Sequence, residues 1–283
     1  MRLGIGSFSF PWAIGIPGFP ALPQPMNAFD LLEAAARLKV SAVQYVDNLP
    51  LTALSPGDLR HLLERARSAG IAIEVGMRGT RADGQDGLRA HLALARRVGS
   101  PFVRVMFDRY EDGDTPTADE IIARIGPLVP EGEAAGVALA LENFDRFPAR
   151  TLLRIVESLG GPDRGVGVCL DTVNNLGALE GPDEVAWVLA PYALNLHVKD
   201  VVIQRKPHRL GFEVEGRPAG AGMVDIPHIL TQIPGAASVT LELWTAPAAT
   251  IEATVRKEAE GVEASVAYLK PLVAARSREV KRN

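Results

Sequence analysis

The sequence predicts an α/β fold, a single (β/α)₈ barrel over residues 1–283, from three observations. Eight short apolar runs alternate with eight segments of helical periodicity. The runs are nearly uninterrupted, as expected for parallel strands that are covered on both faces. The length of 283 residues suits such barrels, which commonly form one domain of ~250 residues. An open, doubly wound sheet is the alternative, although Gly4 and Gly6 supply only the start of a dinucleotide-binding glycine motif.

The first four strand–helix units occupy the N-terminal half of the chain. The strands are expected at residues 3–10, 42–46, 71–75 and 102–106, and the helices at about 27–38, 55–69, 85–98 and 117–136. Asn27 can cap the first helix, and Pro56 stands at the first position of the second, which Gly70 ends. Thr117 and Glu120 form a capping-box pattern at the start of the fourth helix.

The last four units follow the same alternation, with one long interruption. Their strands are expected at residues 137–141, 166–170, 194–198 and 239–243, and their helices at about 151–159, 182–190, 226–232 and 248–276. The paired glycines Gly160 and Gly161 end the first of these helices. Residues 201–222 show little periodicity and are expected to form a long loop, which in a compact domain is usually functional or without fixed structure.

Composition and charge narrow the class of protein. The net charge of −4, from 30 basic and 34 acidic residues, gives no reason to expect a nucleic-acid or membrane partner. Cys169 is the one cysteine, so an intramolecular disulfide is excluded and a reducing compartment is favoured; we expect this residue to be buried as a small apolar side chain. No signal peptide or apolar membrane span is recognisable, which predicts a soluble cytoplasmic protein. The sequence leaves the formation of a homo-oligomer open.

Four consecutive strands each deliver one metal-ligating residue at the C-terminal end. Glu142, Asp171, His197 and Glu242 stand at these ends, and in a barrel of this kind the C-terminal ends of the strands form the active site. Three carboxylates and one imidazole make a hard, oxygen-rich site that suits Mn²⁺, Mg²⁺ or Co²⁺ and is also compatible with Zn²⁺. The alternative is that each is a strand-end charge reaching solvent, but four at equivalent places favour one metal site.

The residues around these four ligands form short motifs that resemble a known family. The motifs are Leu141-Glu142-Asn143, Leu170-Asp171-Thr172, Leu196-His197-Val198-Lys199-Asp200 and Leu241-Glu242-Leu243. In combination they resemble the xylose-isomerase-like TIM-barrel family, the sugar phosphate isomerase/epimerase group. This group includes ketose 3-epimerases, hydroxypyruvate isomerases, inosose dehydratases and the endonuclease IV branch. The resemblance covers essentially the whole chain.

The resemblance implies a chemistry for the site. Glu142, Asp171, His197 and Glu242 would coordinate one divalent metal ion, with Mn²⁺ favoured, and the substrate would be a small sugar or sugar-like molecule. Glu142 and Glu242 would also be catalytic, moving the proton on the carbon next to the carbonyl through an enediolate. A cation that polarises a carbonyl stabilises such an intermediate, and a carboxylate near the carbon can act as general base. A metal-dependent isomerase or epimerase is therefore the first functional hypothesis.

Two departures from the ketose 3-epimerase pattern keep a second reaction open. This chain has Asn174 where the epimerases have a His, and Pro148 where they have a second Glu. Both positions handle substrate hydroxyls in the epimerases. A lyase or dehydratase of the same barrel, which eliminates a group from a keto-sugar or inosose, is therefore the alternative. A third hypothesis is a non-catalytic, sugar-binding barrel, and the thin set of remaining histidines argues against the endonuclease branch.

Six residues are candidates for contacts with the substrate: Lys199, His208, Arg217, Asn174, Arg104 and Trp244. Lys199 either binds an oxyanion beside the metal or pairs with Asp200. His208 and Arg217 lie in the 201–222 segment and belong either to a lid over the site or to a solvated basic loop. Arg104 lies inside an apolar strand, where a charge is costly unless paired, so it either pairs with Glu74 or points into the pocket. Trp244 either stacks on a sugar face or packs in the core.

Overall fold

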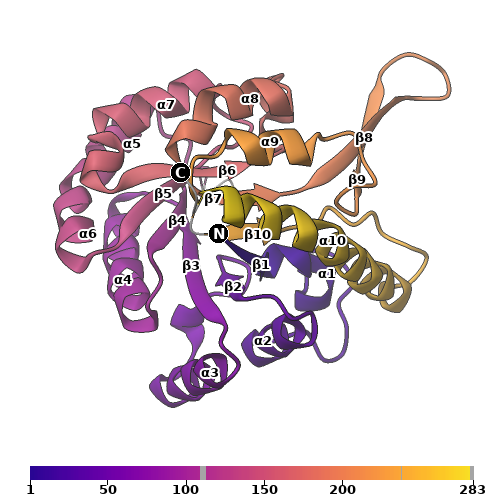
Figure 1. The fold of residues 1–283 in the computed structure, drawn as a ribbon, viewed down its shortest axis with the longest axis horizontal. Coiled ribbons are helices and arrows are strands. Elements are labelled where there is room, and N and C mark those ends of the chain that lie inside the picture. Colours follow the sequence, from indigo (N-terminus) through magenta and orange to yellow (C-terminus); the bar gives the residue numbers. More distant parts are fainter. Residues whose placement is uncertain (109–112, 237, 281–283) are drawn as a thin grey trace.

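A computed structural model describes residues 1–108, 113–236 and 238–280, and its centre is a closed barrel of eight parallel strands (Figure 1). In spatial order the strands are β1 (Arg2–Gly6), β2 (Ala42–Tyr45), β3 (Ala72–Arg78), β4 (Phe102–Met106), β5 (Ala138–Glu142), β6 (Val166–Asp171), β7 (Ala193–Val198) and β10 (Ser238–Leu241). Pairing of β10 with β1, which sets Ser238 opposite Arg2, closes the barrel. The predicted α/β barrel is therefore confirmed.

Helices surround the barrel and bury their apolar faces against it (Figure 1). They are α1 (Pro11–Ile14), α2 (Ala28–Arg37), α3 (Pro56–Ser68), α4 (Ala82–Val98), α5 (Ala118–Ile125), α6 (Val129–Ala135), α7 (Ala149–Ser158), α8 (Pro182–Leu189), α9 (Ile226–Gln232) and α10 (Ile251–Val280). Short 3₁₀ turns occupy Ser7–Ser9, Leu51–Ala53, Gly126–Leu128, Gly161–Arg164, Asn174–Ala178 and Ala190–Tyr192. None of the helices in the described ranges is long and apolar enough to cross a membrane.

Local sequence signals explain most helix boundaries. The Asn27 side chain accepts hydrogen bonds from the backbone N–H groups of residues 29 and 30 at the start of α2. Thr117 and Glu120 form the capping box that begins α5. The single helix expected at 117–136 is instead interrupted between α5 and α6, because Pro127 has no backbone N–H to continue it. The first strand also ends earlier than expected, at Gly6, where a 3₁₀ turn begins.

The segment that was expected to be a loop contains a β-hairpin. β8 (Asp200–Arg205) and β9 (Phe212–Arg217) pair in antiparallel fashion, and Figure 1 shows them projecting beyond the ring of helices. The prediction of a loop over 201–222 was therefore wrong for these two stretches. The apolar–polar alternation from Phe212 to Arg217 is a strand pattern, and the basic turn between the two strands obscured it.

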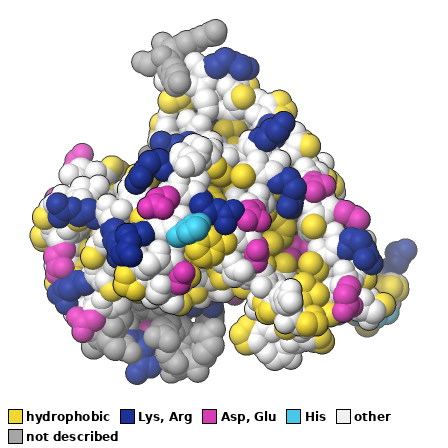
Figure 2. All heavy atoms as spheres, turned by 90° about the horizontal axis from the view of Figure 1, so that it is seen from below, with side chains coloured by type: hydrophobic (Ala, Val, Ile, Leu, Met, Phe, Trp, Pro, Cys, Tyr) yellow, Lys and Arg dark blue, Asp and Glu magenta, His cyan; other side chains and the backbone are white. Residues whose placement is uncertain are grey.

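Charged side chains of both signs are dispersed over one face of the molecule (Figure 2). On the face shown in Figure 2, basic and acidic side chains are interspersed with apolar ones. This distribution agrees with the small net charge of −4. The face therefore offers no single-sign patch of the kind that binds polyanions.

A buried carboxylate ties α10 to the N-terminal segment. Glu258 is fully buried, and its two oxygens accept the backbone N–H groups of Trp12, at 2.9 Å, and Ala13, at 3.0 Å, at the start of α1. These two hydrogen bonds lower the pKa of Glu258, but burial opposes them and raises its pKa to about 7. This carboxyl group therefore titrates in the folded protein near neutral pH.

The Glu258 contact predicts a pH-dependent stability. The folded state holds the proton more tightly than the unfolded chain, whose carboxyl titrates near 4.5. The stabilisation by this group is thus complete below about pH 4.5 and is lost as the pH rises to about 7, a change of about 3 kcal/mol. Between pH 5 and pH 8, Glu258→Gln should lose less stability than the wild type. The free energy of unfolding is measured by denaturant unfolding at both pH values. An equal decrease in the wild type and in Glu258→Gln would contradict the prediction.

Candidate metal centre

The four predicted ligands meet at the C-terminal end of the barrel. Glu142 ends β5, Asp171 ends β6, His197 lies in β7, and Glu242 follows β10. The parallel register sets Asp171 opposite His197, and His197 in turn opposite Thr240 of β10. All four side chains are buried, and one ligand atom from each lies within 4.8 Å of the others.

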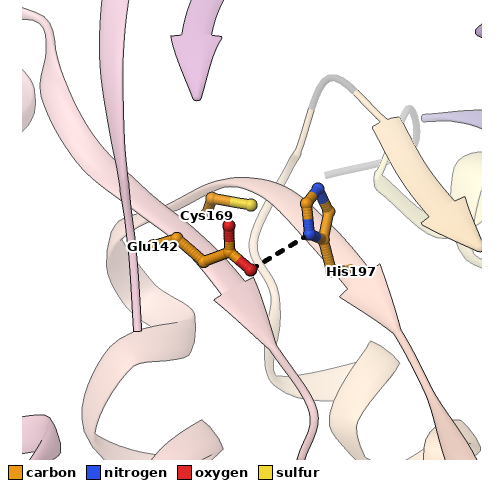
Figure 3. A group of neighbouring side chains, drawn as sticks. All are labelled: Glu142, Cys169 and His197. Atoms are coloured by element: carbon orange, nitrogen blue, oxygen red, sulfur yellow. Dashed lines mark ion pairs between the residues drawn. The ribbon is translucent and has the colours of Figure 1, made fainter. Parts of the chain in front are cut away.

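The geometry of these atoms fits a cation. Nδ1 of His197 lies 3.4 Å from Oε1 of Glu142 and 3.3 Å from Oε1 of Glu242. Figure 3 shows the imidazole and the Glu142 carboxylate pointing toward each other, with the Cys169 thiol beside them. Neither Nδ1 of His197 nor Oε1 of Glu242 has a hydrogen-bond partner among the described residues. Buried polar atoms without partners are costly, and a shared cation would satisfy both. Mn²⁺ and other oxygen-preferring divalent ions suit this donor set.

Arg104 fixes Glu142 from inside the barrel. Nε of the fully buried Arg104 contacts Oε2 of Glu142, and its Nη1 contacts Asp47 at 3.0 Å. Nδ2 of Asn174 donates to the other oxygen of Glu142 at 3.0 Å. Burial by itself would raise the pKa of Glu142, but Arg104 and then His197 hold that pKa well below its usual range. Glu142 is therefore held as an ionised, weakly basic carboxylate.

Lys199 bridges two of the ligand carboxylates. Its ammonium group contacts Asp171 and lies 2.7 Å from Oε2 of Glu242. Burial alone would lower the pKa of Lys199, but Asp171 and Glu242 raise it above its ordinary value. The ring of Trp244 covers the ammonium group at 5.9 Å. Lys199 therefore remains charged beside the ligand cluster.

A pocket of about 560 Å³ opens onto the centre. This volume suits a small metabolite. Glu142, Glu242 and Lys199 form part of its floor, and four aromatic residues form part of its wall: Phe8, Trp12, Phe144 and Trp244. The base of the hairpin completes this wall, because Gly216 packs so closely on Trp244 that a Cβ there would lie 1.9 Å from the Trp244 carbonyl oxygen. The pocket therefore combines a polar floor with an apolar wall.

The predicted substrate contacts divide into two groups. Lys199, Asn174, Arg104 and Trp244 all line the pocket. His208 instead lies exposed at the turn of the hairpin, and Arg217 pairs with Glu215; neither is among the residues that line the pocket. The two ion pairs suggested as alternatives are not formed: Arg104 pairs with Glu142 and Asp47 rather than Glu74, and Lys199 pairs with Asp171 and Glu242 rather than Asp200.

Three residues that were not predicted from the sequence support the centre. Gln44 and Asn195 lie in the barrel interior under His197, and Asp47 is the second partner of Arg104. The signal for Gln44 and Asn195 was present, since each is a polar residue inside an apolar strand. Asp47 follows β2 as an acidic residue just after a strand, the same pattern that identified the ligands.

Comparison with known proteins places this geometry in context. The family model described as xylose isomerase-like TIM barrel matches residues 32–272. A 3-oxo-isoapionate decarboxylase from Pectobacterium atrosepticum is 31% identical over 272 residues, which cover 95% of both chains.

Solved structures share the fold at lower sequence identity. A xylose isomerase domain protein from Planctomyces limnophilus superposes with a TM-score of 0.69 at 18% identity, over 98% of each chain. A xylose isomerase-like TIM barrel protein from Mycobacterium smegmatis, in complex with magnesium, gives a TM-score of 0.65 at 16% identity, over 95% of this chain and 97% of that one.

Proposed function

Because this chain belongs to the xylose isomerase-like TIM-barrel family, we propose that it is a divalent-metal-dependent lyase that decarboxylates a hydroxylated 3-oxo acid. Glu142, Asp171, His197 and Glu242 would hold the cation, with Mn²⁺ as the first choice and Mg²⁺, Co²⁺ or Zn²⁺ as alternatives. The substrate is a small, sugar-like acid that enters the pocket above these ligands. This proposal follows the lyase hypothesis from the sequence and specifies that the eliminated group is carbon dioxide.

The reaction needs charge stabilisation more than it needs a strong base. The bond between C2 and the carboxyl carbon breaks, carbon dioxide leaves, and the electron pair stays on C2 as an enolate conjugated with the 3-oxo group. A proton then adds to C2 and gives the ketone. A cation held by the four ligands would supply Lewis-acid stabilisation of the developing negative charge, which is worth several kcal/mol.

The ion pair between Arg104 and Glu142 is the observation that carries this choice. An isomerase that works through an enediolate must remove a proton from carbon, and a carboxylate is a poorer general base when its pKa is depressed. Arg104 holds Glu142 in that weakly basic state. Decarboxylation does not require a carboxylate to remove a proton from carbon. The 31% identity to the 3-oxo-isoapionate decarboxylase over 95% of both chains supports the same reaction.

Lys199 has a defined part in this scheme. It lies on the floor of the pocket and stays protonated between Asp171 and Glu242. Its positive charge stabilises the negative charge that develops on the substrate. The ammonium group also supplies the proton that C2 takes up, and solvent restores it. The wall formed by Trp12, Phe144 and Trp244 limits the access of water to the carbanion.

A metal-dependent isomerase or epimerase is the second candidate. Glu142 and Glu242 come from β5 and from the end of β10, and both line the pocket. Carboxylates delivered from different strands can remove a proton from one side of a carbon and return it to another. In this reaction Glu142 and Glu242 are the catalytic pair, and Asn174, which donates to Glu142, contacts a substrate hydroxyl.

One experiment separates these functions. The purified protein is incubated in D₂O with Mn²⁺ and with hydroxylated 3-oxo acids, starting with 3-oxo-isoapionate, that carry ¹³C in the carboxyl group. Ketoses and inososes are tested in parallel, and Mg²⁺, Co²⁺ and Zn²⁺ replace Mn²⁺ in further samples. We expect release of labelled carbon dioxide and a product with one deuterium at C2.

Each other outcome has a consequence for the proposal. Deuterium exchange with formation of an isomer, and without carbon dioxide, would reject the decarboxylase and support the isomerase. Loss of water from an inosose would support a dehydratase. No turnover and no exchange with any of the four cations would reject both enzymes and favour a sugar-binding barrel.

A further inference from the structure

A chain of buried amide groups lies beneath the metal centre, and its direction can be deduced from one end. Nδ2 of Asn195 lies 3.3 Å from the backbone carbonyl oxygen of Ser238 and 2.8 Å from its hydroxyl. A carbonyl oxygen only accepts hydrogen bonds, so the NH₂ group of Asn195 must face Ser238. The carbonyl oxygen of the Asn195 side chain therefore faces the opposite way, into the barrel.

The orientation of Asn195 fixes that of Gln44. Oδ1 of Asn195 lies 3.1 Å from Nε2 of Gln44, and the same NH₂ group lies 3.4 Å from Oε2 of Glu74. The opposite orientation of the Gln44 amide would set its oxygen against two acceptor oxygens and leave buried groups unsatisfied, which costs about 1–3 kcal/mol per group. The Gln44 oxygen Oε1 is therefore the atom that faces His197.

Gln44 in turn decides which nitrogen of His197 carries the proton. Its Oε1 lies 2.7 Å from Nε2 of His197, and because Oε1 can only accept, Nε2 must donate. In the neutral ring the lone pair then belongs to Nδ1. That atom faces Glu142 (Figure 3) and lies 3.3 Å from Oε1 of Glu242, and it has no hydrogen-bond partner among the described residues.

We propose that Gln44 is a positioning residue that holds His197 in the Nε2–H tautomer and so directs the Nδ1 lone pair at the divalent cation. A ligating histidine commonly donates its other N–H to a carboxylate or carbonyl oxygen, and loss of that acceptor commonly weakens metal binding by 10–100-fold. Here the acceptor is an amide on β2, which β10 and β1 separate from β7 in the barrel, with Asn195 and Ser238 behind it. The inference rests on the proposed metal site and is independent of the reaction at that site.

The test compares two substitutions of Gln44. Gln44→Met keeps the length of the side chain and removes the acceptor, whereas Gln44→Glu, as the neutral acid, keeps an acceptor oxygen at the same reach and an O–H donor that can face Asn195. By calorimetry we expect Gln44→Met to bind Mn²⁺ 10–100-fold more weakly than the wild type, and Gln44→Glu to bind within a few-fold of it. Gln85→Met makes the same change at a half-buried position in α4 and should leave Mn²⁺ binding unchanged.

A second measurement addresses the tautomer directly. In ¹⁵N-labelled, metal-free wild-type protein at alkaline pH, NMR should assign the His197 proton to Nε2. The His197 signals are identified by their loss in His197→Gln. An Nδ1–H tautomer in the wild type, or Mn²⁺ binding by folded Gln44→Met within about two-fold of the wild type, would overturn the inference. If Gln44→Met does not fold, the tautomer of the wild type decides. Wild-type protein that binds no divalent cation would reject the metal site, and the tautomer would still be measured.

Discussion

Glu142→Gln is expected to abolish turnover, with kcat falling by about 10²–10⁴ or more. The substitution removes one of the three carboxylates proposed to hold the cation, and several kcal/mol of Lewis-acid stabilisation correspond to that range of rate. It also leaves Arg104 with Asp47 as its one remaining ion-pair partner described above. Breaking a buried ion pair typically costs about 3–5 kcal/mol, so a lower unfolding midpoint is expected as well.

The measurement must separate lost chemistry from lost structure. Circular dichroism and thermal unfolding establish whether Glu142→Gln is folded at the assay temperature, and calorimetry measures its affinity for Mn²⁺. Glu213→Gln makes the same change at an exposed position of the hairpin. It should leave turnover, the unfolding midpoint and the affinity for Mn²⁺ unchanged. A folded Glu142→Gln variant with wild-type turnover would show that Glu142 is neither a ligand nor a catalytic residue.

The fold was largely predictable because its signals are local. Apolar runs, caps such as Asn27 and Thr117, and terminal glycines act within a few residues of where they stand. The barrel then follows because alternating strands and helices bury both faces of the sheet only in a few ways. The hairpin was missed because its basic turn obscured the alternation from Phe212 to Arg217, and because β9 has no buried residue that would mark it as part of the core.

The ligand set was predictable from position, but its supporting contacts were not. Strand ends converge by topology, so Glu142 and Asp171 could be grouped without knowing the register. The partner of Arg104 depends on the register, which sets Arg104 beside Gly76 of β3. A Cβ on Gly76 would lie 3.0 Å from Cβ and Cδ of Arg104, so the glycine leaves the space through which the guanidinium reaches Glu142. No pattern in the sequence encodes that packing.

Lys199→Met is expected to change turnover and metal affinity in opposite directions. The ammonium group contacts Asp171 and lies 2.7 Å from Glu242, so it competes electrostatically with a divalent cation for the same two carboxylates. Its removal should therefore strengthen binding of Mn²⁺. Turnover should nevertheless fall by about 10²–10⁴ if Lys199 supplies the proton that C2 takes up.

Stability provides the third readout for Lys199. In metal-free Lys199→Met, the buried carboxylates of Asp171 and Glu242 lose the ammonium group that pairs with them, so the midpoint of thermal unfolding should fall. Binding of Mn²⁺ to the folded state replaces the lost charge, so saturating Mn²⁺ should raise the midpoint of Lys199→Met more than that of the wild type. Lys270→Met, exposed on α10, should match the wild type in all three measurements.

The combination of these readouts distinguishes the two candidate reactions. A decarboxylase that depends on Lys199 loses turnover even when the metal site is fully occupied, because the charge and the proton near C2 are both missing. An isomerase that moves its proton through Glu142 and Glu242 keeps most of its turnover once Mn²⁺ saturates the variant, because neither carboxylate is removed. If metal affinity and turnover fall together in a folded variant, Lys199 holds the ligand carboxylates in place and its assignment as proton donor is wrong.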